Sequence, residues 1–288
     1  MSDVRKVGRS AKGYPALLRA IHDPPPQLWV RGPADLGLFD GCCLAIVGAR
    51  SCSAYGRSVA RSLAREAAAA GAVVVSGLAR GVDGEAHRGA LDSAGRTVAV
   101  LGCGIDRDYP AAHRQLAAGI VEAGGLIVSE YEPGIEPAPW RFPARNRIIS
   151  GVSQLTVVVE ARERSGALIT ADFALEQGRD VMAVPGEITS AMSAGTNGLL
   201  RQGATPMTRI EDVLVELGLE GARAPKAAPL SELEEKILAA VVDQETTADE
   251  IARATGHDVG LTAATLVSLE LAGRVSASEG AYRSTIPP

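Results

Sequence analysis

Short apolar runs alternate with helical patterns through the middle of the chain. The runs are rich in β-branched residues and fall at 44–47, 73–75, 97–101, 126–128, 155–159 and 181–184. Alanine-rich segments lie between them, and residues 56–70 (GRSVARSLAREAAAA) show the clearest helical spacing of apolar positions. Buried strands that alternate with helices predict an α/β fold with a doubly wound, mostly parallel sheet.

The last sixty residues have a different pattern. Three helical segments are expected at 231–242, 247–254 and 261–271, the first opening with a capping box in which Glu234 follows Ser231. The second helix is expected to end at Gly256. Two short strands at 273–276 and 280–283 follow the third helix. Three helices and a hairpin predict a small winged-helix domain.

These patterns divide the chain into four parts. Residues 1–40 are expected to form an N-terminal stub and linker, with a short helix, the stiff segment Pro24-Pro25-Pro26 and a strand. Residues 41–217 form the expected α/β domain, and residues 218–229 are a linker rich in Gly, Ala and Pro. Residues 230–288 form the winged-helix domain.

Composition and charge restrict how the core is built and which partners the chain can bind. Aromatic residues make up only 3% of the chain, so the core must be built from Ala, Val, Leu and Ile. The net charge of −5 argues against a nucleic-acid binder until it is divided by segment. Residues 1–40 carry +2, the middle carries −1, and residues 229–288 carry −6. A near-neutral body can still hold a basic pocket, because the local field matters more than the total.

Several classes of protein are not indicated. The chain has no run of about 18 uncharged apolar residues, and its polar, basic start lacks the apolar segment of a secretory signal. A cytoplasmic protein without a membrane partner is therefore expected. The four cysteines show no CxxC spacing and no companion histidines, so a zinc site is not indicated. Neither a metal nor a cofactor is expected.

Glycines or small polar residues follow nearly every predicted strand. In a parallel sheet these strand ends share one edge, where exposed backbone N–H groups beside helix N-termini favour an anion such as phosphate. A single such glycine serves a turn more often than a ligand, but five on one edge carry more weight. Neither GxGxxG nor GxxxxGK[ST] is present, so a standard nicotinamide site and a P-loop are not indicated.

Basic residues are interleaved along the same edge. Arg50 follows the first buried strand, Arg80 lies in the second turn, and Arg145-Asn146-Arg147 opens a helix after Phe142-Pro143. Arginine at a strand end can hold a phosphate bidentately, although an isolated arginine is more often a solvated surface charge. The candidate DNA-binding residues are Arg50, Ser51, Gly77, Arg80, Gly102, Arg145, Asn146, Arg147, Ser165 and Gly166.

The sequence contains no convincing set of residues arranged for catalysis. His87 lies on a predicted helix without a nucleophile in register, which favours a packing or capping role. Asp106 and Asp108 could hold a metal, but turn formation explains them equally well.

Eight ordered strings resemble the DNA-processing protein A (DprA/Smf) family. They are LAIVGARS, VSGLARGVDGEAH, TVAVLGCGIDRDYP, SEYEPG, FPARNRIISG, VVVEARERSGALIT, GRDVMAVPG and GTNGLLRQG. The resemblance covers residues 13–217 and extends to the tail. It implies an extended Rossmann-like fold, single-stranded DNA held in a positively charged pocket, a homodimer, and delivery of the strand to the RecA recombinase in natural transformation and recombination.

The resemblance also assigns residues by position. It places the phosphate-holding arginine at Arg50, the basic pair of the FPxRN stretch at Arg145 and Arg147, and the Ser-Gly-Ala turn at 165–167. Two departures stand out. Tyr109-Pro110 is followed by alanines where many members carry a basic residue, although Arg114 could replace it. The first forty residues are expected to correspond to only the last stub of the helical N-terminal domain that many members have.

The sequence is compatible with two functions, a DNA-binding protein and a nucleotide-processing enzyme. A binding module would hold single-stranded DNA largely by backbone electrostatics, since Phe142 and Tyr109 are the only aromatic residues near the expected pocket. The alternative is a nucleotide-processing enzyme similar to the lysine-decarboxylase-like phosphoribohydrolases, which carry PGGxGTxxE with a catalytic glutamate. Here the corresponding turn reads ERSGALITAD and lacks both the second glycine and that glutamate. The sequence therefore favours a binding protein that is not an enzyme.

Overall fold

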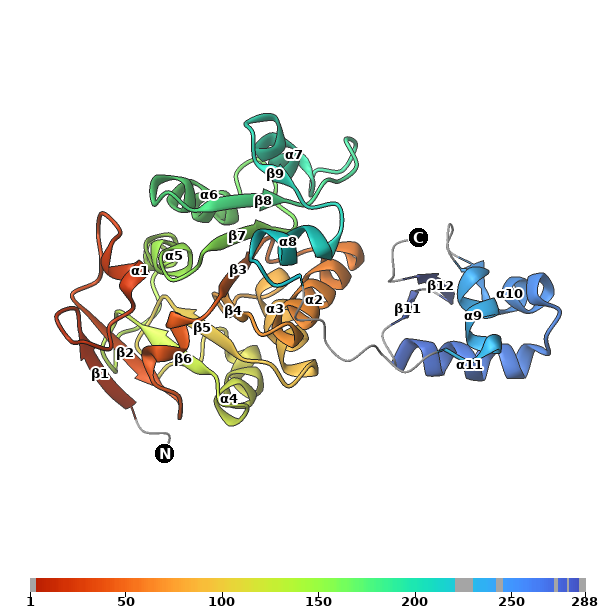
Figure 1. Cartoon of the computed structure of the whole chain (residues 1–288), viewed down its shortest axis with the longest axis horizontal. Coiled ribbons are helices and arrows are strands. Elements are labelled where there is room, and N and C mark those ends of the chain that lie inside the picture. The colour runs from red at the N-terminus through yellow and green to blue at the C-terminus, as the bar shows by residue number, and fades with distance from the viewer. Residues whose placement is uncertain (1–3, 221–229, 242–245, 272–273, 279, 285–288) are drawn as a thin grey trace. The chain divides into compact units, whose positions relative to one another are not determined.

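A nine-stranded sheet runs through the N-terminal part of the chain, in the order β1-β2-β6-β5-β4-β3-β7-β8-β9 (Figure 1). The computed structural model describes residues 4–220, 230–241, 246–271, 274–278 and 280–284. The seven strands from β6 to β9 in this order are parallel, which confirms the mostly parallel α/β sheet. The strands are β1 (Val4–Gly8), β2 (Gln27–Arg31), β3 (Cys43–Val47), β4 (Val73–Ser76), β5 (Thr97–Leu101), β6 (Leu126–Ser129), β7 (Leu155–Val158), β8 (Asp180–Ala183) and β9 (Thr205–Pro206).

Helices cover both faces of this sheet, as the pleat of β3 shows. Cys43, Ala45 and Val47 face a core shared with α1 and α5, whereas Leu44 and Ile46 face a core shared with α2 and α3. Every residue of β3 is buried. The helices of this part are α1 (Ala16–Arg19), α2 (Ala54–Ala69), α3 (Val82–Asp92), α4 (Arg114–Glu122), α5 (Arg141–Gly151), α6 (Gly166–Glu176), α7 (Ala194–Arg201) and α8 (Ile210–Glu216), with short 3-10 turns at Leu36–Asp40 and Ala111–His113.

The first forty residues differ from the expected stub and linker. Strand β2 pairs antiparallel with β6, and β1 pairs antiparallel with β2, so residues 4–31 extend the main sheet. The strand expected near Leu28 is present, but β1 and β9 were not predicted. Both are edge strands. Strand β1 (VRKVG) has two charged residues in its centre, and β9 is only two residues long, so neither shows a recognisable pattern of apolar residues in the sequence.

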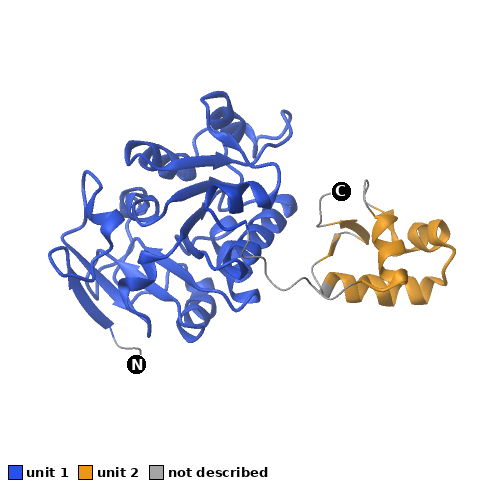
Figure 2. Cartoon of the chain, in the orientation of Figure 1, with its two compact units in different colours: residues 1–224 blue, residues 225–288 orange. Residues whose placement is uncertain are grey.

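Two compact units make up the chain, residues 1–224 and residues 225–288 (Figure 2). Their division falls inside the segment that composition marks as a linker. The second unit contains α9 (Glu232–Ala239), α10 (Ala248–Thr255) and α11 (Val259–Leu271), with a three-stranded sheet in the order β10 (Thr246–Thr247), β12 (Ala281–Ser284), β11 (Val275–Ser278).

This second unit confirms the winged-helix prediction. Its own core consists of Ile237, Val241, Ile251, Leu266, Leu269 and Val275. Ser231 and Glu234 form the expected capping box, and α10 ends at Gly256 in the left-handed conformation, with φ +70°. The predicted segments at Val242 and Gly273 extend into residues outside the described ranges.

Helices α2 and α3 pack closely against one face of the sheet. Small residues make this possible: Ala60, Ala64 and Ala67 on α2 are buried. Gly89 on α3 lies so near that an added Cβ would come within 2.1 Å of the Arg61 carbonyl oxygen. The approach of the two helices therefore depends on the missing side chain.

His87 is buried in the same layer, with no exposed surface. Its Nδ1 lies 2.7 Å from Thr97 Oγ1, and this hydroxyl donates to the Val74 carbonyl, so Nδ1 carries the proton and donates to Thr97. Nε2 is buried and has no hydrogen-bond partner among the described residues. Burial lowers the pKa of His87 to about 3, and the packing role expected from the sequence fits this environment.

We expect Gly89→Ala to lower the free energy of unfolding of residues 1–224 by roughly 1–3 kcal/mol, because overpacking forces the helices apart. Gly119→Ala on α4 is the matched control, since its added Cβ would only touch Leu91 Cδ1 at 3.7 Å. That change should be neutral or stabilise by about 0.5–1 kcal/mol through helix propensity. Urea denaturation of both variants measures the difference, and equal effects would contradict the proposed close contact.

His87 should make the fold sensitive to acid. The unfolded chain binds the imidazole proton below its ordinary pKa of 6.5, whereas the folded chain binds it only near 3. Stability should therefore fall as the pH drops below 6.5, by up to about 1.4 kcal/mol per pH unit from this group. His87→Gln keeps a donor for Thr97 and removes the titration. Urea denaturation between about pH 7 and about pH 4.5 should show a shallower loss in that variant, and parallel losses would refute the assignment.

Candidate functional site

A pocket opens at the carboxyl end of the sheet where the strand order reverses. The chain winds from β3 through β4 and β5 to β6 in one direction, and from β7 through β8 to β9 in the other. Adjacent strands β3 and β7 therefore mark a topological switch point, the usual place for a ligand in an open α/β sheet. The strand-end pocket has a volume of about 250 Å³ and is lined by Val47, Gly48, Arg50, Ala79, Asp83, Phe142, Pro143, Arg145, Asn146, Ile149, Ser165, Gly166, Ala167 and Thr170.

The loop after β3 presents Arg50. The Ala49 amide donates to the Glu160 carbonyl at 2.7 Å, and the Ser53 amide donates to the Glu160 carboxylate at 2.8 Å, so both sides of the arginine are fixed. The Arg50 side chain is exposed, and its guanidinium lies 5.4 Å from the centre of the Phe142 ring. Among the described residues it forms no ion pair, which leaves its charge available to a ligand.

Arg145 forms the floor of the strand-end pocket. It is 4% exposed, and its Nη1 donates to the carbonyls of Gly77, at 2.8 Å, and Val100. Burial lowers the pKa of Arg145 to about 10, so the side chain remains charged at neutral pH. Its Nε is buried without a hydrogen-bond partner in the described part of the chain. A buried cation of this kind favours an anionic neighbour.

Asp83 supplies the negative charge opposite Arg145. Burial raises the pKa of this carboxyl, and the charge of Arg145 opposes that rise. The carboxylate also accepts hydrogen bonds from the amides of Gly77, at 3.1 Å, and Ala79, at 3.3 Å. Asp83 thus closes the loop between β4 and α3, with both N–H groups donating to one carboxylate oxygen, Oδ2.

The amino end of α6 forms the third wall. Ser165 is the N-cap and accepts from the Ala167 amide at 3.3 Å, while the Asn146 amide group donates to the Gly166 carbonyl at 3.0 Å. The first N–H groups of a helix have no partner within the helix and carry partial positive charge. Together with Arg50 they make this wall suited to an anion such as phosphate.

The structure separates the ten candidate residues into two groups. Five of them line the strand-end pocket: Arg50, Arg145, Asn146, Ser165 and Gly166. Ser51 and Arg80 are exposed on the loops after β3 and β4, outside the lining. The pocket lining also excludes Gly77, Gly102 and Arg147. The two glycines make room for side chains of α5, and Arg147 is held in an ion pair.

The two glycines allow α5 to approach the strand ends. A Cβ on Gly77 would lie 2.6 Å from the Arg145 guanidinium, and a Cβ on Gly102 would lie 2.9 Å from the Phe142 ring. Both glycines therefore position pocket residues without facing the pocket themselves.

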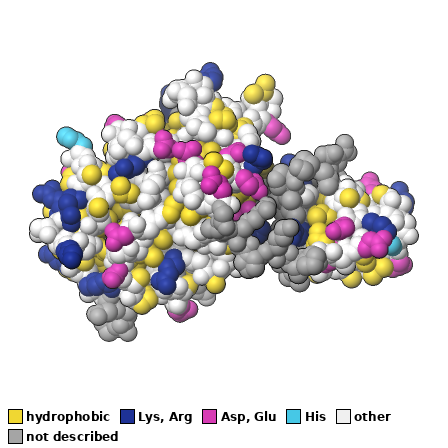
Figure 3. All heavy atoms as spheres, viewed as in Figure 1, with side chains coloured by type: hydrophobic (Ala, Val, Ile, Leu, Met, Phe, Trp, Pro, Cys, Tyr) yellow, Lys and Arg dark blue, Asp and Glu magenta, His cyan; other side chains and the backbone are white. Residues whose placement is uncertain are grey.

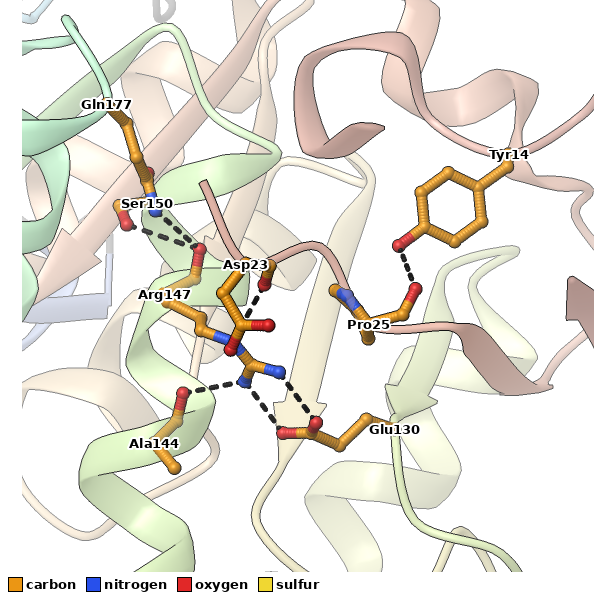
Figure 4. Close-up of polar contacts among 8 residues, drawn as sticks. All are labelled: Tyr14, Asp23, Pro25, Glu130, Ala144, Arg147, Ser150 and Gln177. Atoms are coloured by element: carbon orange, nitrogen blue, oxygen red, sulfur yellow. Dashed lines mark hydrogen bonds and ion pairs between the residues drawn. The ribbon is translucent and has the colours of Figure 1, made fainter. Parts of the chain in front are cut away.

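Arg147 is engaged in a structural ion pair (Figure 4). Its two Nη atoms donate to the two carboxylate oxygens of Glu130 at 2.8 Å, and its Nε lies 3.2 Å from Asp23 Oδ2. Nη1 also donates to the Ala144 carbonyl. With its charge balanced by two carboxylates, Arg147 fastens α5 to the segment that leads into β2.

Sequence reasoning did not identify several lining residues, namely Asp83, Pro143, Ile149 and Thr170. A usable signal was present in the helical spacing. Phe142, Arg145 and Ile149 fall on one face of α5, and Gly166 and Thr170 fall on one face of α6. Asp83 gave no such signal, because an acidic residue in the first turn of a helix usually serves only the helix.

The two aspartates that could have held a metal ion have structural roles. Asp106 accepts from the Gly134 amide and Asp108 pairs with Arg31 at 2.6 Å, so both aspartates have structural partners. Within the described ranges, no group of three or more His, Cys, Asp or Glu side chains could hold a metal ion. No described helix is long and apolar enough to span a bilayer.

Comparison with known proteins places the chain in a family. Residues 6–218 match the family described as DNA recombination-mediator protein A, and residues 221–281 match the DprA winged helix domain. Protein Smf of Escherichia coli K12 is 41% identical over 283 residues, covering 93% of this chain and 74% of that protein. The DNA processing protein DprA of Bacillus subtilis 168 is 43% identical over 214 residues, covering 74% and 71%.

Two solved structures share the fold. DprA from Streptococcus pneumoniae has a TM-score of 0.69 at 40% identity, covering 74% of each chain. DprA from Helicobacter pylori has a TM-score of 0.67 at 31% identity, covering 75% of this chain and 98% of that one, and its structure describes the single-stranded DNA binding mode of that protein. The motifs, the fold and these similarities agree, and the chain belongs to the DprA/Smf family of DNA recombination-mediator proteins.

Proposed function

We propose that this protein binds single-stranded DNA at the strand-end pocket and delivers it to the RecA recombinase during DNA uptake and recombination. It acts as a homodimer and carries out no reaction on the DNA. RecA delivery and dimerisation are what the resemblance to the family implies. The DNA-binding part also rests on the geometry of the pocket.

The observation that supports this most strongly is the position of Arg50. Its exposed guanidinium lies beside the Phe142 ring and lines the same pocket as the amino end of α6. A phosphate held there would receive a bidentate contact from arginine and hydrogen bonds from backbone amides. We assign direct DNA contacts to Arg50, Ser165 and Gly166, and a supporting role to Arg145 and Asn146.

The size of the pocket favours a single strand. A volume of about 250 Å³ admits one phosphate or one unstacked nucleotide, and not the width of a duplex. The side chains of Arg80 and Ser51 are exposed on neighbouring loops, where they can contact phosphates on either side. Backbone contacts of this kind give affinity with little sequence preference.

The enzymatic alternative lacks support in the described residues. The nucleophile-and-base arrangement of a hydrolase needs a titratable group within hydrogen-bond reach of a substrate. Asp83, the one carboxylate that lines the pocket, already accepts two backbone N–H groups. Incubation with nucleoside monophosphates tests this alternative, because release of free base would support an enzyme.

We expect the protein to bind a single-stranded oligonucleotide more tightly than a duplex of equal length. Arg50→Ala should weaken that binding and flatten the slope of log affinity against log salt by about 0.7, the value for one phosphate contact on a single strand. Filter binding across a salt series measures both effects. Arg96→Ala is the control, because Arg96 is an exposed residue just before β5, at the opposite end of that strand.

Two results would contradict the proposal. Equal affinity for the duplex would contradict the preference for a single strand that the size of the pocket predicts. An unchanged salt slope in a folded Arg50→Ala protein would remove the phosphate contact assigned to Arg50.

The winged-helix unit has a surface unlike that of a duplex-binding domain. Helix α11, in the position of a recognition helix, contains no Lys or Arg, and its one charged residue is Glu270. Residues 229–288 carry four basic and ten acidic residues. On α11 the apolar side chains of Val259, Leu261 and Val267 are about half exposed. We propose that this unit contacts a protein, either the second subunit or a basic partner surface.

Residues 229–288 on their own should therefore show no duplex binding, even at low salt, because an acidic surface is repelled by phosphates. A chain ending at Gly218 should keep most of its affinity for single strands. Fluorescence anisotropy with labelled duplex and single-stranded oligonucleotides measures both. Micromolar duplex binding by the isolated unit would show that its surface is used for DNA after all.

A further inference from the structure

A second basic surface lies away from the strand-end pocket, on the segment between β1 and α1. We call it the basic groove: Arg9, Ser10, Arg19 and Pro24 line it, and we include Lys12, an exposed cation on the same segment between Arg9 and Arg19. It is shallow and open, and the three cationic side chains are exposed. Lys and Arg side chains gather over the N-terminal elements at the left of Figure 3.

The cations of the basic groove are not neutralised by neighbouring acids. Residues 4–22 contain five Lys or Arg and no Asp or Glu. Among the described residues, Arg9, Lys12 and Arg19 form no ion pair, unlike Arg61 on α2, Arg88 on α3 and Arg147 on α5. The nearest acid along the chain, Asp23, is paired with Arg147 at 3.2 Å.

Arg19 is held in place by the backbone around it. Its Nε donates to the Arg9 carbonyl at 3.2 Å, and its Nη2 donates to the carbonyls of Ala11, at 2.8 Å, and Tyr14, at 3.2 Å. The guanidinium also lies 5.7 Å from the centre of the Tyr14 ring. These contacts neutralise no charge, and they leave Nη1 without a hydrogen bond in the described part of the chain. A fixed cation loses little side-chain entropy when it binds an anion.

The basic groove adjoins the helix that carries the pocket. Asp23, next to Pro24 of the groove, contacts Arg147 on α5, and the same helix presents Arg145 and Asn146 to the strand-end pocket. Helix α1, which ends at Arg19, also packs on α5. The two basic surfaces therefore lie on neighbouring elements of one unit.

An extended polyanion fits the basic groove better than a small anion does. The cations are spread along an open surface without a closed cage, which is the arrangement of a backbone-tracking groove. The strand-end pocket holds about one nucleotide, so a longer strand must continue beyond it. We propose that Arg9, Lys12 and Arg19 bind phosphates of the same single strand beyond the strand-end pocket. This inference rests on the proposed function.

The test uses the full chain with Arg9→Gln and Lys12→Gln combined, since neither side chain holds the fold by a hydrogen bond or ion pair among the described residues. Arg65→Gln combined with Arg96→Gln is the control of equal charge, with Arg65 on α2 across the sheet. Thymidine oligonucleotides of about 6 and about 30 nucleotides serve as probes, bracketing the site of a single binding module. Affinity is measured across a salt series by fluorescence anisotropy.

The groove variant should bind the long probe about tenfold more weakly at low salt, with a log–log slope flatter by about 1.4 for two lost phosphate contacts. Its affinity for the short probe should match that of the unchanged protein, and the control variant should bind both probes normally. Arg50→Ala, by contrast, should weaken binding of both probes. Unchanged affinity and slope for the long probe, or an equal loss in the control variant, would overturn the proposal.

The outcomes separate this inference from the proposed function. If Arg50→Ala weakens both probes and the groove variant weakens neither, the pocket stands and the groove fails. If the groove variant weakens the long probe while Arg50→Ala has no effect, DNA binding by the pocket fails instead.

Discussion

The buried guanidinium of Arg145 connects the sheet to the site. It bridges carbonyls at the ends of β4 and β5, opposite the Asp83 carboxylate. Gly77 lacks a side chain where this guanidinium lies, and Gly102 lacks one where Phe142 lies. The positions of the strand-end turns, of α5 and of the pocket floor therefore depend on one another.

A second contact on the same helix performs a different task. Arg147 is only two residues from Arg145, yet it points to Glu130 and Asp23 and holds the N-terminal segment against α5. One helix thus joins the pocket floor on one side and the anchor of β2 on the other. A shift of α5 would move both, so the N-terminal segment is part of the support of the site and not an appendage to it.

The sequence predicted the central strands closely because each is short, apolar and bounded by small residues, as β5 illustrates at 97–101. Arg50 and the Ser165-Gly166 turn, which the sequence predicted for the strand-end edge, line the pocket, since the carboxyl ends of parallel strands must share one edge. The sequence could not separate Arg145 from Arg147, because both are arginines on one helical stretch and only the packing shows which carboxylates each one meets. It also missed β1, whose pairing depends on a partner strand nineteen or more residues away and not on its own pattern.

The two borders of the nine-stranded sheet bear on how copies of this protein can associate. At one border β9 is only two residues long and ends in Pro206, which has no N–H to offer; at the other, β1 carries Arg5 and Lys6. Short, proline-containing or charged borders resist the edge-to-edge joining that leads to aggregation. Copies of this protein crowded together would therefore meet through their side-chain surfaces, and the sheet itself would not grow from one molecule into the next.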